Sequence, residues 1–218
     1  MSLGDILGVL IVYIYVGSLL FIFDFASERD HFTNRKLIHI LVGNIVFVVP
    51  LFDNRWVIVL LAAAPFILIT YIVSPISSIS TNSKTSHSGH GLGLVYYSIS
   101  WTLLALLFFD HPEIIAVGVI CMSYGDGSAS LFGKRYGEHF LKIARDKKSV
   151  EGSTAMFFVS ISVIITTLYI FGSLPENLLI IPLVVGIATI IEIFSIKGLD
   201  NILVAVSSSI SYYILISL

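Results

Sequence analysis

The sequence predicts an all-α, polytopic integral membrane protein with about seven or eight transmembrane helices. Of its 218 residues, 56% are hydrophobic and only 12% are charged, and the mean hydropathy is +0.97. A typical soluble domain contains about 25% charged residues, so this composition excludes that class. Apolar runs of membrane-spanning length recur along the whole chain. We therefore expect a single membrane-embedded domain over residues 1–218.

Eight apolar segments predict the helices in order. The first lacks the basic region and the cleavage site of a signal peptide, so we expect it to be retained as a helix. The second is short, the fifth carries Asp126 and the eighth is rich in serine, so about six or seven full spans also fit the pattern. The segments are residues 3–24, 37–51, 56–73, 92–109, 113–131, 153–172, 177–194 and 202–218.

The polar connections between these segments differ in charge. Every lysine and arginine except Arg55 falls in the first, third, fifth or seventh connection. Cytoplasmic loops are enriched in Lys and Arg, so we expect these connections to face the cytoplasm and both termini to lie outside. The long connections share that side, which places function at the cytoplasmic surface. The net charge of −2 gives no sign of a nucleic-acid partner, and the single Cys121 excludes a disulfide framework or a cysteine metal site.

The stretch SYGDGSASLFGKRYG, residues 123–137, ends the fifth segment with a carboxylate between two glycines. A charge at membrane depth costs about 2.5–3.5 kcal/mol, which argues against an inert Asp126 there. Glycines expose backbone N–H groups to a ligand, so the stretch predicts a phosphate-binding loop at a helix end; a solvated carboxylate is the alternative. The candidate residues are Gly125, Asp126, Gly127, Ser128, Gly133 and Lys134.

The stretch DKKSVEGSTAM, residues 146–156, combines cations, a carboxylate and a helix start, which we expect to be capped by Ser153 or Thr154. A helix N-terminus binds anions, and phosphoryl transfer needs cations on the phosphates and carboxylate-held Mg²⁺. A stop-transfer cluster before a capped helix is the alternative. The candidate phosphate ligands are Lys147, Lys148, Gly152 and Ser153, and Glu151 is a candidate metal ligand with Asp126.

Two further stretches place polar residues at helix ends. In NRKLIHILVG, residues 34–43, Arg35 and His39 are four apart and share one helix face, with Lys36 beside them. Cytoplasmic anchoring and packing are the alternative roles of these side chains. In EIFSIKGLDN, residues 192–201, Glu192 ends an apolar helix, Gly198 fits its C-cap, and Asp200 or Asn201 fits the next N-cap. We expect Glu192, Asp200 and Asn201 to support the site.

The third connection, SSISTNSKTSHSGHGLG, has the composition of a flexible linker. His87 and His90 lie three apart in it, but no third ligand accompanies them, which argues against a metal site. We expect this connection to be a lid over a cytoplasmic site.

Four separated motifs together resemble those of the dolichol kinase, phytol kinase and CTP-dependent diacylglycerol kinase family, which is related to phosphatidate cytidylyltransferase. The first is Arg35-Lys36 with His39 and Gly43. The second and third are Gly125-Asp126 with Ala129, Gly133 and Gly137, then Lys148 with Glu151, Gly152 and Ser153. The fourth is Glu192 with Lys197-Gly198 and Asp200-Asn201. The motifs extend over nearly the whole chain, although Gly127 stands where many relatives have Thr or Ser.

The resemblance implies a membrane-embedded transferase that uses CTP and Mg²⁺ to phosphorylate a lipid alcohol in the bilayer. Arg35 and Lys36 would neutralise the transferring group, and either Asp126 or His39 would accept the proton of the lipid hydroxyl. A cytidylyltransferase that makes a CDP-activated lipid would use the same residues. A secondary transporter and a structural membrane protein are alternatives of other classes.

Overall fold

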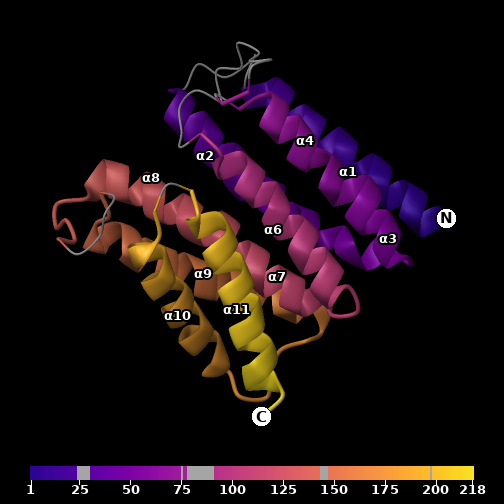
Figure 1. The fold of residues 1–218 in the computed structure, drawn as a ribbon. Helices are drawn as coiled ribbons and strands as arrows, with labels where there is room; N and C mark the ends of the chain where they lie inside the picture. The colour runs from indigo at the N-terminus through magenta and orange to yellow at the C-terminus, as the bar shows by residue number, and fades with distance from the viewer. Residues whose placement is uncertain (24–29, 75, 78–90, 143–146, 197) are drawn as a thin grey trace.

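The helices of this chain form one bundle, and its computed structural model describes residues 1–23, 30–74, 76–77, 91–142, 147–196 and 198–218 (Figure 1). Those residues contain no β-strand; one isolated bridge pairs Phe140 with Ser149. The all-α prediction is therefore confirmed. The elements are α1 (Leu3–Phe21), α2 (His31–Val42), η2 (Gly43–Phe47), η3 (Val49–Leu51), α3 (Arg55–Val57), η4 (Ile58–Ala63), α4 (Ala64–Ile72), α6 (Gly93–Phe108), α7 (Pro112–Ile120), η5 (Cys121–Gly125), α8 (Asp126–Tyr136), α9 (Val150–Phe171), α10 (Ile180–Phe194) and α11 (Asp200–Ile216).

Each of the predicted apolar segments coincides with a helix or with a run of consecutive helical elements. In the described residues, 5 helices are long and apolar enough to cross a membrane: Leu3–Phe21, His31–Leu51, Arg55–Ile72, Pro112–Tyr136 and Val150–Phe171. The shorter apolar helices are α6, α10 and α11. Length and composition thus agree with a polytopic membrane protein.

Local capping explains where several helices begin and end. Ser2 and Asp5 form a reciprocal capping box at the start of α1, and Asp30 accepts a hydrogen bond from the backbone N–H of Thr33 at the start of α2. Pro112 occupies the first turn of α7, where its missing N–H costs nothing. Gly172, with φ of 66°, ends α9 in the left-handed conformation that glycine adopts without strain.

Four predicted helix boundaries are wrong. Helix α2 begins at His31, six residues before the start of the predicted segment. The cap of α9 is Ser149, whose hydroxyl accepts from the N–H of Gly152, so the helix includes Ser153 and Thr154 instead of beginning there. Likewise α8 continues to Tyr136, beyond the expected end at residue 131. The C-cap of α10 is Ser195; Gly198, with φ of 83°, lies in the turn before α11, and Leu199 rather than Asp200 or Asn201 is the N-cap. Helices α8 and α9 thus extend into polar sequence, whereas α10 ends at Phe194, before Gly198.

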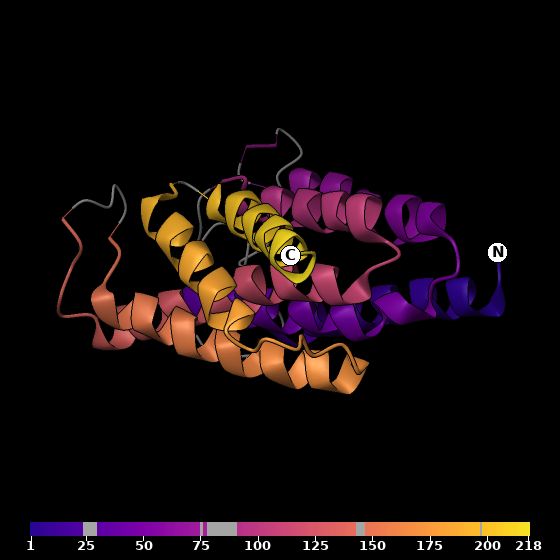
Figure 2. The same ribbon diagram turned by 90° about the horizontal axis from the view of Figure 1, so that it is seen from below.

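The run α7–η5–α8 is the central helix of the bundle, and residues Ile114 to Met122 are almost entirely buried. It packs against α9, α11, α6 and α2, and Figure 2 shows α9, α10 and α11 gathered around it. Glycines permit these close approaches. A Cβ at Gly118 would lie 2.7 Å from the carbonyl oxygen of Ala205 on α11, and one at Gly127 would lie 2.3 Å from Cγ1 of Ile40 on α2. The π-helical η5 interrupts this helix just before Asp126.

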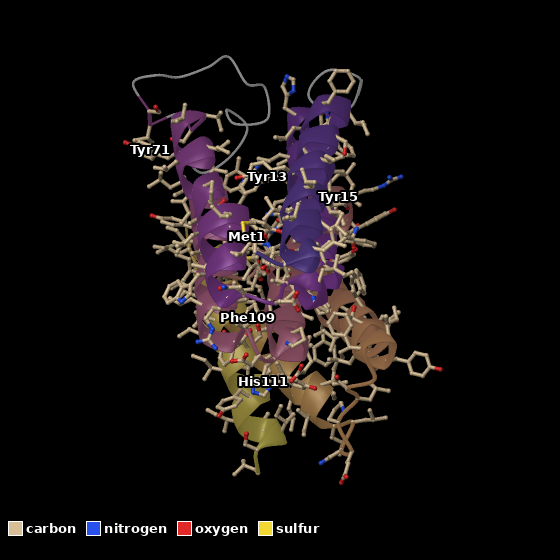
Figure 3. The ribbon with its side chains drawn as sticks, turned by 90° about the vertical axis from the view of Figure 1, so that its right-hand side faces the viewer. Met1, Tyr13, Tyr15, Tyr71, Phe109 and His111 are labelled. Carbon is tan, nitrogen blue, oxygen red and sulfur yellow. The ribbon has the colours of Figure 1, made fainter. Side chains whose placement is uncertain are left out.

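Helix α1 packs at the edge of the bundle and contacts two other elements through tyrosines that point to opposite sides (Figure 3). The hydroxyl of Tyr13 donates to the carbonyl of Leu61 in η4, over 3.0 Å. The hydroxyl of Tyr15 donates to the carbonyl of Leu41 in α2, over 2.9 Å. These two bonds hold α1 across the space between η4 and α2.

Gly118→Ala should destabilise the protein by about 1–3 kcal/mol, because the added methyl group has no room against α11. Thermal unfolding in detergent measures this loss. Gly17→Ala is the matched control, since a Cβ at Gly17 meets nothing within 4 Å. The control should unfold at or above the wild-type temperature, because alanine favours helix. Equal behaviour of the two variants would contradict the close packing of α7 on α11.

Candidate functional site

A polar cavity of about 540 Å³ opens at one end of the bundle, where α2 and α9 begin and α8 and α10 end. Its wall brings together segments that are far apart in the sequence. Most of the sequence-predicted site residues line it, and its charged side chains are of both signs. The lining residues are Phe32, Arg35, Lys36, Asp126, Ala129, Ser130, Gly133, Lys134, Gly137, Phe140, Lys147, Lys148, Ser149, Gly152, Ser153, Glu192 and Asp200.

Asp126 forms a buried ion pair with Lys36, in which Nζ donates to Oδ2 over 2.7 Å. The carboxylate also lies 3.5 Å from Nε2 of His39, and the exposed fraction of Asp126 is 3%. Nε2 of His39 is 3.0 Å from the carbonyl oxygen of Met122. Because a carbonyl can only accept, Nε2 carries a proton, which leaves Nδ1 as the acceptor atom of a neutral imidazole. The predicted carboxylate is thus charged, paired and held at the inner end of the cavity.

Lys148 lies among three carboxylates. Its ammonium donates to Oε1 of Glu192 and lies 3.6 Å from Oδ2 of Asp200, and Asp126 also attracts it electrostatically. Burial lowers the pKa of Lys148, but these carboxylates outweigh burial and hold the pKa above its usual value. Oε2 of Glu192 is buried without a hydrogen-bond partner in the described part of the chain. Glu192 and Asp200, expected only to support the site, are therefore part of its wall.

Arg35 lies where the polar cavity meets a second, apolar cavity, and it lines both. Its Nε is buried and has no hydrogen-bond partner among the described residues. A guanidinium with an unused buried donor is suited to bind an anionic group that enters from the polar side.

Six predicted site residues do not line the polar cavity: Glu151, His39, which lines the apolar cavity, and Gly125, Gly127, Ser128 and Asn201. Gly125 and Gly127 are in a helix and pack against α9 and α2, so the predicted loop conformation is wrong. The hydroxyl of Ser128 donates to the carbonyl of Gly125 over 2.8 Å. The amide of Asn201 donates to the carbonyl of Gly93 over 2.9 Å, which ties α11 to α6. These last four residues position helices within the bundle.

Glu151, the predicted second metal ligand, is also outside the cavity wall. Its Oε1 lies 2.6 Å from Nδ1 of His139, and it accepts from the N–H of His139. Gly152 and Ser153, the next two residues, do line the cavity because successive positions on a helix point in different directions. Among the described residues no three His, Cys, Asp or Glu side chains form a ready metal site.

Two lysines of the predicted phosphate site, Lys147 and Lys134, differ in their surroundings. Lys147 is exposed on the cavity wall. Lys134 ends α8 and pairs with Asp30 at the start of α2 over 2.6 Å, and its ammonium lies 4.4 Å from the ring centroid of Phe32. The pKa of Asp30 is held well below its usual value by Lys134 and by Thr33. His87 and His90 of the predicted lid lie outside the described residues.

Sequence reasoning missed two residues. Ser149 caps α9 and lines the polar cavity. Its hydroxyl accepts from the N–H of Gly152, three residues later, and this spacing in the sequence could have identified Ser149 as the N-cap. Tyr97 lies beside His39, with ring centroids 4.5 Å apart, and donates to the carbonyl of His39 over 3.1 Å. Tyr97 sits in a plain apolar run, so only the fold reveals its contact with α2.

Known proteins similar to this chain are phytol kinases. The sequence is 31% identical over 182 residues to the protein named phytol kinase of Synechocystis sp., an overlap of 81% of this chain and 76% of that protein. The chain belongs to the phytol kinase family. A probable chloroplastic phytol kinase of Zea mays is 29% identical over 96% of the chain and 77% of its own length. Phytol kinase 1 of Arabidopsis thaliana is 27% identical over 83% of the chain. No family model and no solved structure matches the sequence.

His139 should make stability depend on pH. Its hydrogen bond to Glu151 raises its pKa above the usual value, so the pair stabilises the fold when His139 is protonated. That contribution is complete below the unfolded pKa of about 6.5 and is lost as the pH rises through the higher folded pKa. Thermal unfolding of wild type and His139→Gln should differ at pH 5.5 and converge by about pH 9. A constant difference at all pH values would contradict the ion pair.

Proposed function

We propose that this protein is a CTP-dependent lipid-alcohol kinase, which transfers the γ-phosphate of CTP to a lipid hydroxyl. The observation that carries this proposal is that a polar, cation-lined cavity and an apolar cavity share Arg35. A nucleotide and a lipid alcohol need cavities of these two kinds, with their reacting groups at the junction. The names of the phytol kinase relatives support a kinase that acts on a lipid alcohol.

The cations of the polar cavity are suited to the phosphates. Lys147 and Lys148 would contact the nucleotide phosphates, with Lys134 at the rim, and Arg35 and Lys36 would neutralise the group in transfer. Gly133 and Gly152 lie on the same wall, and a Cβ at Gly152 would lie 2.6 Å from the carbonyl oxygen of Ala129, so these glycines let α8 and α9 pack closely beside the site. Phosphates that enter would compete with Glu192 and Asp200 for Lys148.

Two carboxylates of the cavity wall, those of Asp126 and Glu192, would hold Mg²⁺ together with the phosphates of the nucleotide. Magnesium in nucleotide enzymes is held by one or two carboxylates together with substrate phosphates, and rarely by an all-protein cage. The unpartnered Oε2 of Glu192 is a free oxygen donor in this wall. Glu192 with Asp126 therefore replaces Glu151 with Asp126 in our proposal. When bound, Mg²⁺ would neutralise charge on the phosphates.

The proton acceptor is His39 in this proposal. Its imidazole lines the apolar cavity and donates from Nε2 to the carbonyl of Met122, so in the neutral ring the lone pair is at Nδ1. The lipid oxygen would attack the γ-phosphorus while its proton passes to Nδ1. The bond from the γ-phosphorus to the β–γ bridging oxygen breaks, and CDP leaves. Asp126 is paired with Lys36, so in this proposal it is a metal ligand and not the proton acceptor.

The membrane orientation of the site is also proposed. The cations Arg35, Lys36, Lys134, Lys147 and Lys148 gather at the cavity end of the bundle. Arg55 is at the opposite end, where it pairs with Asp110 over 2.5 Å. The end rich in Lys and Arg is expected to face the cytoplasm, which would place both termini outside.

Labelled CTP tests the reaction directly. Purified protein in detergent with Mg²⁺, phytol or geranylgeraniol, and CTP labelled at the γ position should yield labelled lipid phosphate. CTP labelled at the α position should give no labelled lipid. Lipid labelled from the α position would instead establish a cytidylyltransferase. No lipid labelled from either position would reject both transferases and favour a transporter.

His39→Gln should lower kcat for lipid phosphorylation by about 10²–10⁴-fold, since it removes the proton acceptor. The KM for CTP should stay within threefold of wild type, and thermal unfolding should confirm the fold. His111→Gln is the matched control, because His111 lies in the turn between α6 and α7 at the other end of the bundle (Figure 3). An unchanged kcat in His39→Gln would exclude His39 as the acceptor.

A further inference from the structure

The apolar cavity has a volume of about 280 Å³ and lies between α1, α2, η4–α4 and α6. Its walls are formed by aliphatic and aromatic side chains such as Val16, Ile38, Ala62, Phe66 and Trp101. The polar side chains of the lining, among them Arg35 and His39, lie at one end of the cavity. The cavity is thus apolar along its length and polar at the end next to the candidate nucleotide site.

The depth of the cavity follows from the residues that line it. The lining includes Phe52, beyond the end of η3. On α2 and η2 alone it extends from Arg35 to Ile45, which is about 15 Å at 1.5 Å per residue. This is about half of the roughly 30 Å hydrocarbon thickness of a bilayer. One extended hydrocarbon chain can therefore lie in the cavity with its head beside Arg35.

Phe52 lines the end of the cavity that is away from Arg35. This residue follows η3, at the end of the helical run that begins near Arg35, and it is 6% exposed. Its ring packs on α1 at Gly8, where a Cβ would lie 2.7 Å from the ring. The bonds of Tyr13 and Tyr15 hold α1 over the same cavity. A tail that enters from the polar end thus meets a fixed aromatic wall.

We propose that this cavity binds the single hydrocarbon tail of the alcohol substrate, and that Phe52 sets the longest tail it accepts. The inference rests on the proposed kinase function and narrows its substrate class. A volume of about 280 Å³ is near the lower limit of the roughly 300–1,000 Å³ range of ligand pockets, which suits one chain. Diacylglycerol, with two chains, and dolichol, with a very long chain, are excluded by volume and depth.

Two substitutions test the cavity in opposite directions. Ala62 is a small, buried lining residue, and Ala62→Leu would fill part of the cavity. We expect kcat/KM for geranylgeraniol to fall at least tenfold and that for the shorter geraniol to fall less than threefold. Phe52→Ala should open the end away from Arg35 and raise kcat/KM for geranylfarnesol, one isoprene unit longer, relative to geranylgeraniol by at least threefold.

Ala64→Leu is the matched control. It makes the same substitution two residues later, at a half-buried position that does not line the cavity. Its preference among the prenols should equal that of wild type, and the KM for CTP should be unchanged in all three variants. Unchanged prenol preference in both Ala62→Leu and Phe52→Ala, with activity retained, would overturn the tail site.

Photocrosslinking of the wild-type protein decides the matter if a variant does not fold or if the kinase proposal fails. A geranylgeraniol analogue with a diazirine at the far end of its tail should label the peptides that contain Phe52 and Ile58. Labelling only of outward-facing residues such as Leu60 and Leu68, which are 56% and 67% exposed, would overturn the tail site. Because crosslinking needs no turnover, it separates failure of the tail site from failure of the kinase function.

Discussion

The buried ion pair between Lys36 and Asp126 is the contact on which the arrangement of the site depends. It joins α2 to the central helix across 90 residues of sequence, and both side chains are shielded from solvent. Removal of one partner from such a pair leaves an uncompensated buried charge, at a typical cost of about 3–5 kcal/mol. The pair therefore fixes α2 against α8, with the glycine at position 127 providing the close approach to Ile40.

A cluster of balanced charge surrounds this pair inside the polar cavity. Asp126, Glu192 and Asp200 provide three carboxylates, and Arg35, Lys36 and Lys148 provide three cations around them. Such a cluster is tolerable inside a helical bundle because each sign compensates the other in a medium of low dielectric constant. The same cluster can exchange partners, because phosphate oxygens offer Lys148 the same kind of contact that Glu192 and Asp200 now make. The side chains that would bind the phosphates are thus the same ones that stabilise the fold.

The sequence was sufficient to predict the helices, but it did not predict all the contacts between them. Hydropathy located every helical segment, since lipid exposure imposes long apolar runs. It missed the extension of α8 to Tyr136, because the last turn of this helix is polar and lies beyond the apolar run. It favoured Glu151 over Glu192 as a metal ligand because Glu151 is close to Lys148 in sequence. Only the fold shows that Glu192, 44 residues away, touches Lys148, while Glu151 turns toward His139.

Helix α2 connects the two cavities, and its periodicity explains how one helix serves both. Arg35 and His39 are one turn apart and line the apolar cavity, whereas Lys36, the next residue after Arg35, points to Asp126 in the polar one. Two adjacent faces of a single turn thus hold the side chains that we propose to neutralise the phosphoryl group and to accept the proton of the lipid hydroxyl. Because the Lys36–Asp126 pair fixes the rotation of that turn, any rotation of α2 would move both sets of groups together. The relative position of nucleotide and alcohol therefore depends on this rigid turn more than on the connections between the helices.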